Sequence, residues 1–215
     1  MTMIKTTYQP IFDFEDALAE YTGAPCVVLT DCCTHAIELC MRYYNIKKCS
    51  STAFTYISVI QCLKKLGIHL ELTDEKWIGE YRFGNTNIWD SARRLEKNMY
   101  KSGQIQCLSF GINKPLSLGR MGAILLDDTP AYKELSKMRA DGRDLRAYPY
   151  TGATEWAEQN SFGPAFHYCP TLEDCKKGLE QLPNTQGQCQ TIEYPDCRKL
   201  EISILNYEQT ANTTH

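Results

Sequence analysis

The chain has 215 residues, a formal net charge of −3, 43% hydrophobic residues and 23% charged residues. These values are ordinary for a folded globular protein and argue against a dedicated nucleic-acid binder, which would carry a basic face. No segment approaches the roughly 18 apolar residues of a membrane span, and residues 1–10 lack the apolar core of a signal peptide. We therefore expect a cytoplasmic protein with no membrane contact.

Hydrophobic periodicity predicts helices that alternate with short apolar strands. In the first half we expect helices and strands over these ranges in chain order: helix 12–21, strand 26–29, helix 34–44, strand 51–54, helix 56–66, strand 68–72 and strand 87–90. In the second half we expect strands 105–110 and 121–126, joined by a turn-rich loop, and helices 131–140 and 172–182. This order predicts an α/β three-layer sandwich with a mostly parallel sheet.

Two segments of unequal size are expected. Residues 1–182 carry the α/β pattern, and residues 183–215 form a C-terminal extension that is richer in Gln, Asn and Thr and less ordered at its end. The eleven cysteines show no paired spacing of the zinc-ribbon type, so we expect no metal site and interpret most of them as reduced thiols in the core.

Three positions follow apolar strands, where α/β proteins bind ligands. Thr34 opens a helix after strand 26–29, and the helix N-terminus with its hydroxyl favours an anion such as phosphate, although a plain N-cap is the simpler interpretation of Thr34 alone. Tyr56 begins another helix and could lie against a planar ring or pack in the core. Asp90 ends strand 87–90, and a buried carboxylate there needs a cationic partner, for which a protonated pyridine nitrogen would serve.

Lys114 lies in the loop between two apolar strands, five residues after Ser109 and close to Gly119 and Gly122. A lysine on a surface needs no explanation, but a lysine in this setting indicates a functional group.

These features, in this order, resemble the DegT/DnrJ/EryC1/StrS family of pyridoxal-phosphate (PLP) sugar aminotransferases, which have the fold-type I PLP domain. The similar motifs lie at residues 33–37, 52–56, 89–92 and 109–122, with further similarity at 14–23, 123–128 and 178–182. Each motif is modest, and the ordered set is specific. The resemblance covers most of residues 12–182, so residues 1–182 are expected to form a trimmed PLP-binding domain and residues 183–215 to be a remnant of the small domain or a substitute for it.

The resemblance implies a role for each matching residue. Lys114 would link covalently to PLP and move the proton between the donor Cα and the cofactor, and Asp90 would keep the pyridine nitrogen protonated. Tyr56 would stack on the ring. The phosphate would be held by Thr34, the backbone amide of His35 and Ser109. Cys33, in the same turn as Thr34, is expected to be part of the cofactor-binding segment.

The chain also departs from the family pattern. Arg93 stands where the family has His or Gln, and the resemblance places it among the cofactor-binding residues. Met121 stands where the family has Gly. His167 aligns with the family Asn that reaches the phosphate of the neighbouring subunit, and an unrelated histidine is an equally good interpretation. Family members are considerably longer, both between residues 56 and 90 and after residue 182. Because the family builds its active site across a dimer interface, we expect a homodimer.

The leading hypothesis is an aminotransferase that moves an amino group from an amino acid, with glutamate expected, to a keto sugar nucleotide or a similar small keto substrate. The dehydratase branch of the family replaces the lysine, whereas Lys114 is present. Two alternatives remain open: a PLP-dependent decarboxylase or lyase acting on another amine, such as a modified nucleotide, and a degenerate PLP-binding or scaffold homologue. Arg93 and Met121 favour the degenerate homologue, whereas retention of Asp90, Ser109 and Lys114 opposes it.

Overall fold

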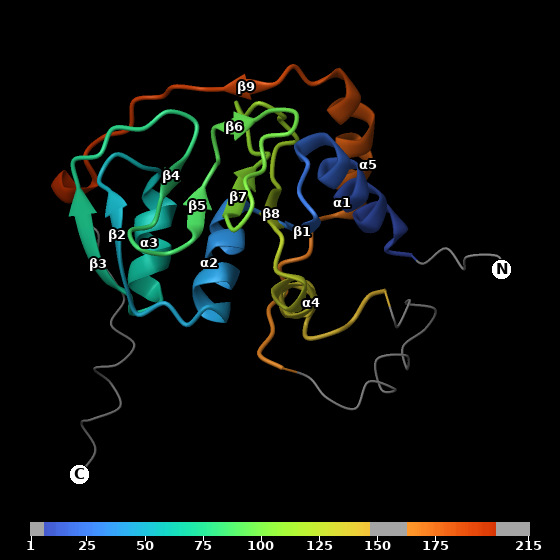
Figure 1. Cartoon of the computed structure of the whole chain (residues 1–215), viewed down its shortest axis with the longest axis horizontal. Helices are drawn as coiled ribbons and strands as arrows, with labels where there is room; N and C mark the ends of the chain where they lie inside the picture. The colour runs from blue at the N-terminus through green and yellow to red at the C-terminus, as the bar shows by residue number, and fades with distance from the viewer. Residues whose placement is uncertain (1–6, 147–162, 201–215) are drawn as a thin grey trace, which may run out of the picture.

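The computed structural model describes residues 7–146 and 163–200. Its helices are α1 Gln9–Thr22, α2 Cys33–Tyr43, α3 Ile57–Lys65, α4 Thr129–Met138 and α5 Leu172–Gln181. Its strands are β1 Cys26–Thr30, β2 Lys48–Thr52, β3 His69–Thr73, β4 Tyr81–Arg82, β5 Ile88–Asp90, β6 Arg94–Leu95, β7 Ile105–Ser109, β8 Gly122–Leu126 and β9 Gln188–Cys189. Every helix and every longer strand predicted from the sequence is present (Figure 1).

The main sheet has the strand order β1-β8-β7-β5-β4, and β2 and β3 form a separate parallel pair. In the main sheet β5 and β7 are parallel, whereas β8 is antiparallel to both β1 and β7, and β4 is antiparallel to β5. The predicted α/β class is confirmed, but the sheet is mixed rather than mostly parallel. The loop 110–121 contains no helix, and β8 returns antiparallel beside β7.

Helices cover both faces of this sheet, which confirms the three-layer arrangement. Successive residues of β1 point to opposite sides: Val27 and Leu29 pack in the core beneath α1 and α5, and Val28 packs in the core beneath α2, α3 and α4. On the first side Gly178 of α5 lies directly against the Phe14 ring of α1, so the two helices approach closely.

A buried ion pair fixes α1 to the sheet. The Arg139 Nη1 atom donates to Glu15 Oε1 at 2.5 Å and to the Leu29 carbonyl at 2.6 Å, and the Leu29 amide donates to the same Glu15 oxygen at 3.0 Å. Both charged side chains are buried, so each needs the other. Helix α1, strand β1 and the residue after α4 are thereby held in one arrangement.

One strand begins and ends earlier than the sequence predicts. Strand β2 spans Lys48–Thr52 instead of 51–54. The hydroxyl of Thr52 accepts a hydrogen bond from the Phe54 amide at 3.0 Å and donates one to the Glu75 carbonyl at 2.7 Å, which turns the chain out of the strand.

The segment after α5 crosses one end of the sheet. It passes through a 3-10 turn at Leu182–Asn184, pairs β9 with β6, and reaches a second 3-10 turn at Cys197–Lys199. Figure 1 shows it running from α5 to the side of β2 and β3. We call residues 188–199 the C-terminal strap. The far end of the extension, where less order is expected, lies outside the described residues from 201 onward.

All eleven cysteines are unpaired, and six of them are buried: Cys40, Cys49, Cys62, Cys107, Cys175 and Cys197. This agrees with the interpretation of most of them as core thiols. Among the described residues, no helix is both long enough and apolar enough to span a bilayer.

We predict that Gly178→Ala destabilises the protein. A methyl group at this position would overlap the Phe14 ring, so α1 and α5 must separate or repack, at a cost of about 1–3 kcal/mol. Urea unfolding measures the change, with Glu180→Ala on the exposed side of the same helix as the control. An unchanged free energy of unfolding for Gly178→Ala would show that the close packing of α1 on α5 is wrong.

Candidate active site

A cavity of about 520 Å³ opens at one end of the main sheet. Strands β1, β5 and β7 run in the same direction, so the segments that follow them meet at this end. The cavity is lined by the starts of α2 and α3, the end of β5, the loop 110–121 and the strap. Seven residues predicted from the sequence line it: Cys33, Thr34, Tyr56, Asp90, Arg93, Ser109 and Lys114.

Asp90 is a buried carboxylate at the end of β5. Its Oδ1 accepts a hydrogen bond from the Ala92 amide at 2.9 Å, and its Oδ2 accepts one from the Tyr81 hydroxyl at 3.0 Å. Both partners are uncharged, and no described cation lies within ion-pair distance. Burial therefore raises the pKa of Asp90, and the Ala92 amide and the charge of Lys114 offset only part of this.

Tyr81 lies beside Asp90, although no sequence pattern selected it. It is almost fully buried, its ring packs against Trp77, and its hydroxyl lies 2.8 Å from the Thr55 hydroxyl as well as donating to Asp90. It comes from β4, a two-residue strand next to β5 that shows no periodic pattern. Tyr81 fixes the orientation of the Asp90 carboxylate.

Lys114 lies in the loop 110–121 and faces the same cavity. No described residue accepts a hydrogen bond or forms an ion pair with its side-chain nitrogen. Burial lowers the pKa of Lys114 and the neighbouring charge of Arg93 lowers it further, while Cys33 and Asp90 act in the opposite direction. The amine is therefore more readily neutral, and more nucleophilic, than that of a surface lysine.

Two helix N-termini converge on the cavity. The hydroxyls of Thr34 in α2 and Ser58 in α3 lie 2.7 Å apart, although only Thr34 was selected from the sequence. A Cβ atom at Gly122 would lie 2.5 Å from the Cys33 backbone nitrogen, so β8 can approach the start of α2 only because this residue is glycine. Amide groups and hydroxyls at paired helix starts suit an anion.

Ser109 and Tyr56 line the cavity from two different elements, β7 and the start of α3. Ser109 ends β7, and its Oγ accepts a long hydrogen bond of 3.4 Å from the Gly111 amide. Tyr56 precedes α3, is 59% exposed and contacts the Tyr194 ring of the strap edge to face. Tyr56 is thus not a core residue, which was the alternative interpretation of its position.

His35 does not line the cavity. Its Nδ1 lies 2.6 Å from Asp31 Oδ1, and its ring stacks on Tyr168 with 3.7 Å between centroids. Burial acts to lower its pKa, but the hydrogen bond with Asp31 and the proximity of Cys32 raise the pKa of His35 to about 9. Its backbone amide lies in the first turn of α2, and the phosphate contact expected of it stays a prediction.

His167 also lies outside the cavity of its own chain. Its side chain is 85% exposed and sits 3.1 Å from the Asp141 carboxylate. The role implied for it lies in the site of a neighbouring subunit, so that role stays a prediction.

Asp31, Cys32 and His35 form the one group of potential metal ligands among the described residues, with ligand atoms within 4.8 Å of one another. Asp31 Oδ2 already accepts a hydrogen bond from Arg120 at 2.8 Å. The carboxylate is therefore shared between Arg120 and His35, and the group is accounted for as an ion-pair cluster.

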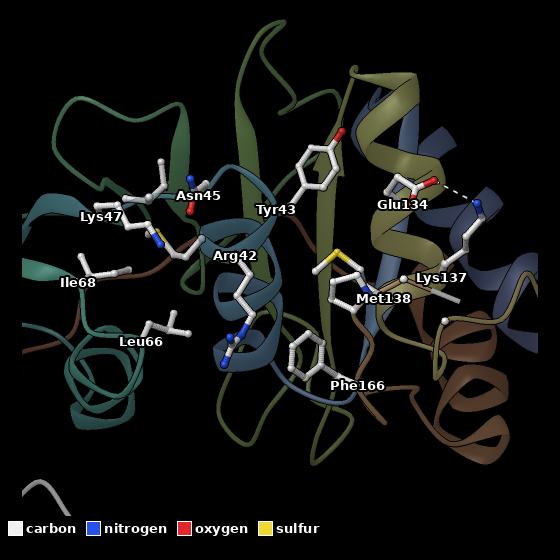
Figure 2. Close-up of a pocket in the computed structure, with 15 residues that line it drawn as sticks. Arg42, Tyr43, Asn45, Lys47, Leu66, Ile68, Glu134, Lys137, Met138 and Phe166 are labelled. Atoms are coloured by element: carbon white, nitrogen blue, oxygen red, sulfur yellow. Dashed lines mark hydrogen bonds and ion pairs between the residues drawn. The ribbon is translucent and has the colours of Figure 1, made fainter. Parts of the chain in front are cut away.

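A second cavity, of about 450 Å³, lies between the end of α2, α4 and residues 163–166 (Figure 2). Arg42 sits over the Phe166 ring there, 4.8 Å from its centroid, and Glu134 pairs with Lys137. None of the residues predicted to be catalytic or cofactor-binding lines this cavity.

Comparison with known proteins bears on the first part of the chain. Residues 2–75 match the model of the DegT/DnrJ/EryC1/StrS aminotransferase family. The predicted resemblance is therefore confirmed for this stretch, which includes Cys33, Thr34 and Tyr56 but ends before Asp90 and Lys114. No curated protein matches the chain.

Solved structures show the fold. The chain is similar to 3-amino-5-hydroxybenzoic acid synthase (16% identity, TM-score 0.62, covering 82% of this chain and 56% of that one). It is also similar to Helicobacter pylori PseC, an aminotransferase involved in the biosynthesis of pseudoaminic acid (14% identity, TM-score 0.64, covering 85% of this chain and 60% of that one). A third similar structure is the E. coli GDP-4-keto-6-deoxy-D-mannose-3-dehydratase with bound hydrated PLP (14% identity, TM-score 0.65, covering 83% of this chain and 61% of that one). The chain thus has the fold-type I architecture but spans only 56 to 61% of these proteins.

We predict that Asp90→Asn gains stability relative to the wild-type chain, without cofactor, as the pH rises from about 4 to about 7. The folded-state pKa of Asp90 is raised above its usual value of 3.8, so the ionised carboxylate is disfavoured in the folded chain. This penalty is absent below the unfolded-state pKa and grows as the pH rises through the folded-state pKa.

Urea unfolding of both proteins across this pH range measures the difference. Asp127→Asn is the matched control with the opposite sign, because the Ser102 hydroxyl and the Gly103 amide lower the pKa of Asp127. If the difference in free energy of unfolding between Asp90→Asn and the wild type stayed constant across this pH range, Asp90 would not be a buried carboxylate without a cationic partner.

Proposed function

We propose that the chain is a PLP-dependent aminotransferase that takes an amino group from an amino acid, with glutamate as the expected donor, and passes it to a keto substrate. One observation carries the proposal: the buried Asp90 carboxylate has only neutral partners and faces the same cavity as Lys114. A buried carboxylate without a cation is costly, and a ligand with a protonated ring nitrogen removes that cost.

The residues of the cavity fit PLP. Asp90 would hold the ring nitrogen, and Lys114 would carry the covalent link. Thr34, Ser109 and the amide of His35 would hold the phosphate at the paired helix starts, with Ser58 beside Thr34. When bound, PLP supplies an electron sink that stabilises negative charge at the substrate carbon.

The chain's own groups then divide the work. Lys114, whose pKa is lowered, supplies a neutral amine as nucleophile and afterwards moves a proton to and from the donor Cα. Asp90 keeps the proton on the ring nitrogen, and Tyr81 keeps Asp90 in position. Tyr56 and Trp77 give the cavity an aromatic wall against which a flat ring can lie.

The acceptor is proposed to be a keto sugar nucleotide or a smaller keto compound. The resemblance of residues 2–75 to a sugar-aminotransferase family and the fold shared with PseC support the sugar. The cavity of about 520 Å³, which would also have to hold PLP, supports the smaller compound.

The enzyme is further proposed to be a homodimer whose subunits meet at the mouth of the cavity. Ile112 is 73% exposed and Tyr56 is 59% exposed, and both lie at the cavity. The dimer itself follows from the resemblance to the family, which builds its active site across a dimer interface, and these two exposed side chains are proposed to lie in that contact.

We expect the PLP-loaded protein to show a visible absorption band that Lys114→Ala abolishes, while Lys133→Ala, an exposed lysine, retains it. Glutamate should then convert the bound cofactor to its pyridoxamine form, read as a spectral shift. Release of carbon dioxide without that shift would indicate the decarboxylase instead. The absence of any band after incubation with PLP would rule out both enzymes and leave the scaffold.

Ile112→Asp is expected to shift the protein toward the monomer in sedimentation experiments, because the charge would be buried between subunits. Ile78→Asp, another exposed isoleucine that does not line the cavity, serves as the control. A wild-type chain that sediments as a monomer with PLP bound would refute the dimer.

A further inference from the structure

Arg93 is a buried guanidinium in the cavity with no acidic partner. Its Nη1 donates to the Asn113 carbonyl at 2.7 Å and to Gln190 Oε1 at 3.1 Å, and its Nε and Nη2 both donate to the single Tyr194 hydroxyl, at 3.4 and 3.3 Å. Its relative exposure is 9%, and no carboxylate forms an ion pair with it in the described ranges 7–146 and 163–200. A buried charge that bonds only neutral acceptors is incompletely compensated.

The cavity holds more unpaired positive charge than negative charge. Arg93 and Lys114 face one carboxylate, Asp90, whose two oxygens are taken by Ala92 and Tyr81. Arg120 also lines the cavity but pairs with Asp31. Under the proposed function, Asp90 would be matched by the ring nitrogen and the phosphate would lie at the helix starts, so Arg93 would still lack an anion.

The geometry of Arg93 points to a carboxylate. Its Nε and Nη2 form one edge of the guanidinium, and both donate long bonds to one hydroxyl oxygen. A carboxylate can occupy the same edge with two oxygens, one for each donor, in the bidentate arrangement that arginine favours. The Tyr194 hydroxyl, which now only accepts there, can turn to donate to that carboxylate.

The strap holds Gln190 and Tyr194, the two strap residues that bond Arg93, in place. Gln190 is fixed by backbone bonds, since its amide donates to the Arg93 carbonyl and its carbonyl accepts from the Gly79 amide. Tyr194 stacks on Trp77, with 5.9 Å between centroids. Beyond Tyr194, the buried Cys197 is held by a bond from its amide to the Ala53 carbonyl. The strap therefore builds a fixed wall over Arg93.

We propose that Arg93, together with Tyr194 of the strap, is the carboxylate-binding site of the amino-acid donor and of the oxo acid formed from it. This inference rests on the proposed function and names the substrate group that this side of the cavity recognises. The strap would then have a role in substrate binding, since it supplies one wall of the cavity.

The test uses maleate, an unreactive dicarboxylate, as the probe. Calorimetry gives its dissociation constant for wild-type, Arg93→Gln, Arg93→Lys and Tyr194→Phe proteins, with and without PLP. Absorbance titration gives the dissociation constant for PLP. Arg82→Gln, an exposed arginine outside the cavity, is the matched control, and circular dichroism checks that each variant is folded.

Loss of charge-assisted bonds should weaken maleate binding by about 10- to 100-fold in Arg93→Gln, and by less in Arg93→Lys and Tyr194→Phe. PLP affinity should stay within about threefold of the wild-type value, since the proposal places no cofactor oxygen on Arg93. If Arg93→Gln weakens PLP but not maleate, the anion belongs to the cofactor. If neither changes, Arg93 only anchors the strap. Either outcome overturns the proposal.

Two further readouts keep the test separate from the proposed function. If PLP does not bind at all, the proposed function fails, while maleate binding to the cofactor-free protein still reports on Arg93. If Arg93→Gln does not fold, Tyr194→Phe decides, because it keeps the ring on Trp77 and removes only the hydroxyl. Unchanged maleate affinity in that variant would then overturn the assignment.

Discussion

The site depends on one buried carboxylate. Asp90 sits at the end of β5 with both oxygens bonded to neutral donors, and no described cation pairs with it. Folding has therefore placed a charge where it is expensive unless a positively charged group joins it. Tyr81 and Ala92 orient the carboxylate without neutralising it, and Lys114 and Arg93 act on it only at longer range. Under the proposed function, a ligand cation would join Asp90 and anionic groups would lie around it.

The backbone explains how a short chain can assemble such a cavity. Strands β1, β5 and β7 share a direction, so the segments after them carry Thr34, Asp90 and Lys114 to one end of the sheet. The buried pair of Glu15 and Arg139 fixes α1 to this sheet from below. The opposite wall comes from the strap, which pairs through β9 with β6. The chain thus closes its site with a segment that returns across the sheet.

Much of this could be predicted from the sequence because it depends on local pattern. Helix and strand periodicity located the main elements, and strand ends located Thr34, Asp90 and Lys114 beside one cavity. The antiparallel course of β8 could not be predicted in this way, because an apolar strand pattern does not show the direction in which the strand pairs. Tyr81 could not be predicted, since a two-residue strand has no period. Tyr194 contacts Arg93 over a hundred positions of sequence, which no local signal reveals.

We propose Lys114 as the residue that would link covalently to PLP in this cavity. Borohydride reduction of the PLP-loaded chain makes such a link permanent, and mass spectrometry of its peptides identifies the modified lysine. We expect the label on Lys114, because burial and the charge of Arg93 leave its amine neutral more readily than that of an exposed lysine. A label spread over surface lysines with Lys114 unmodified would contradict it.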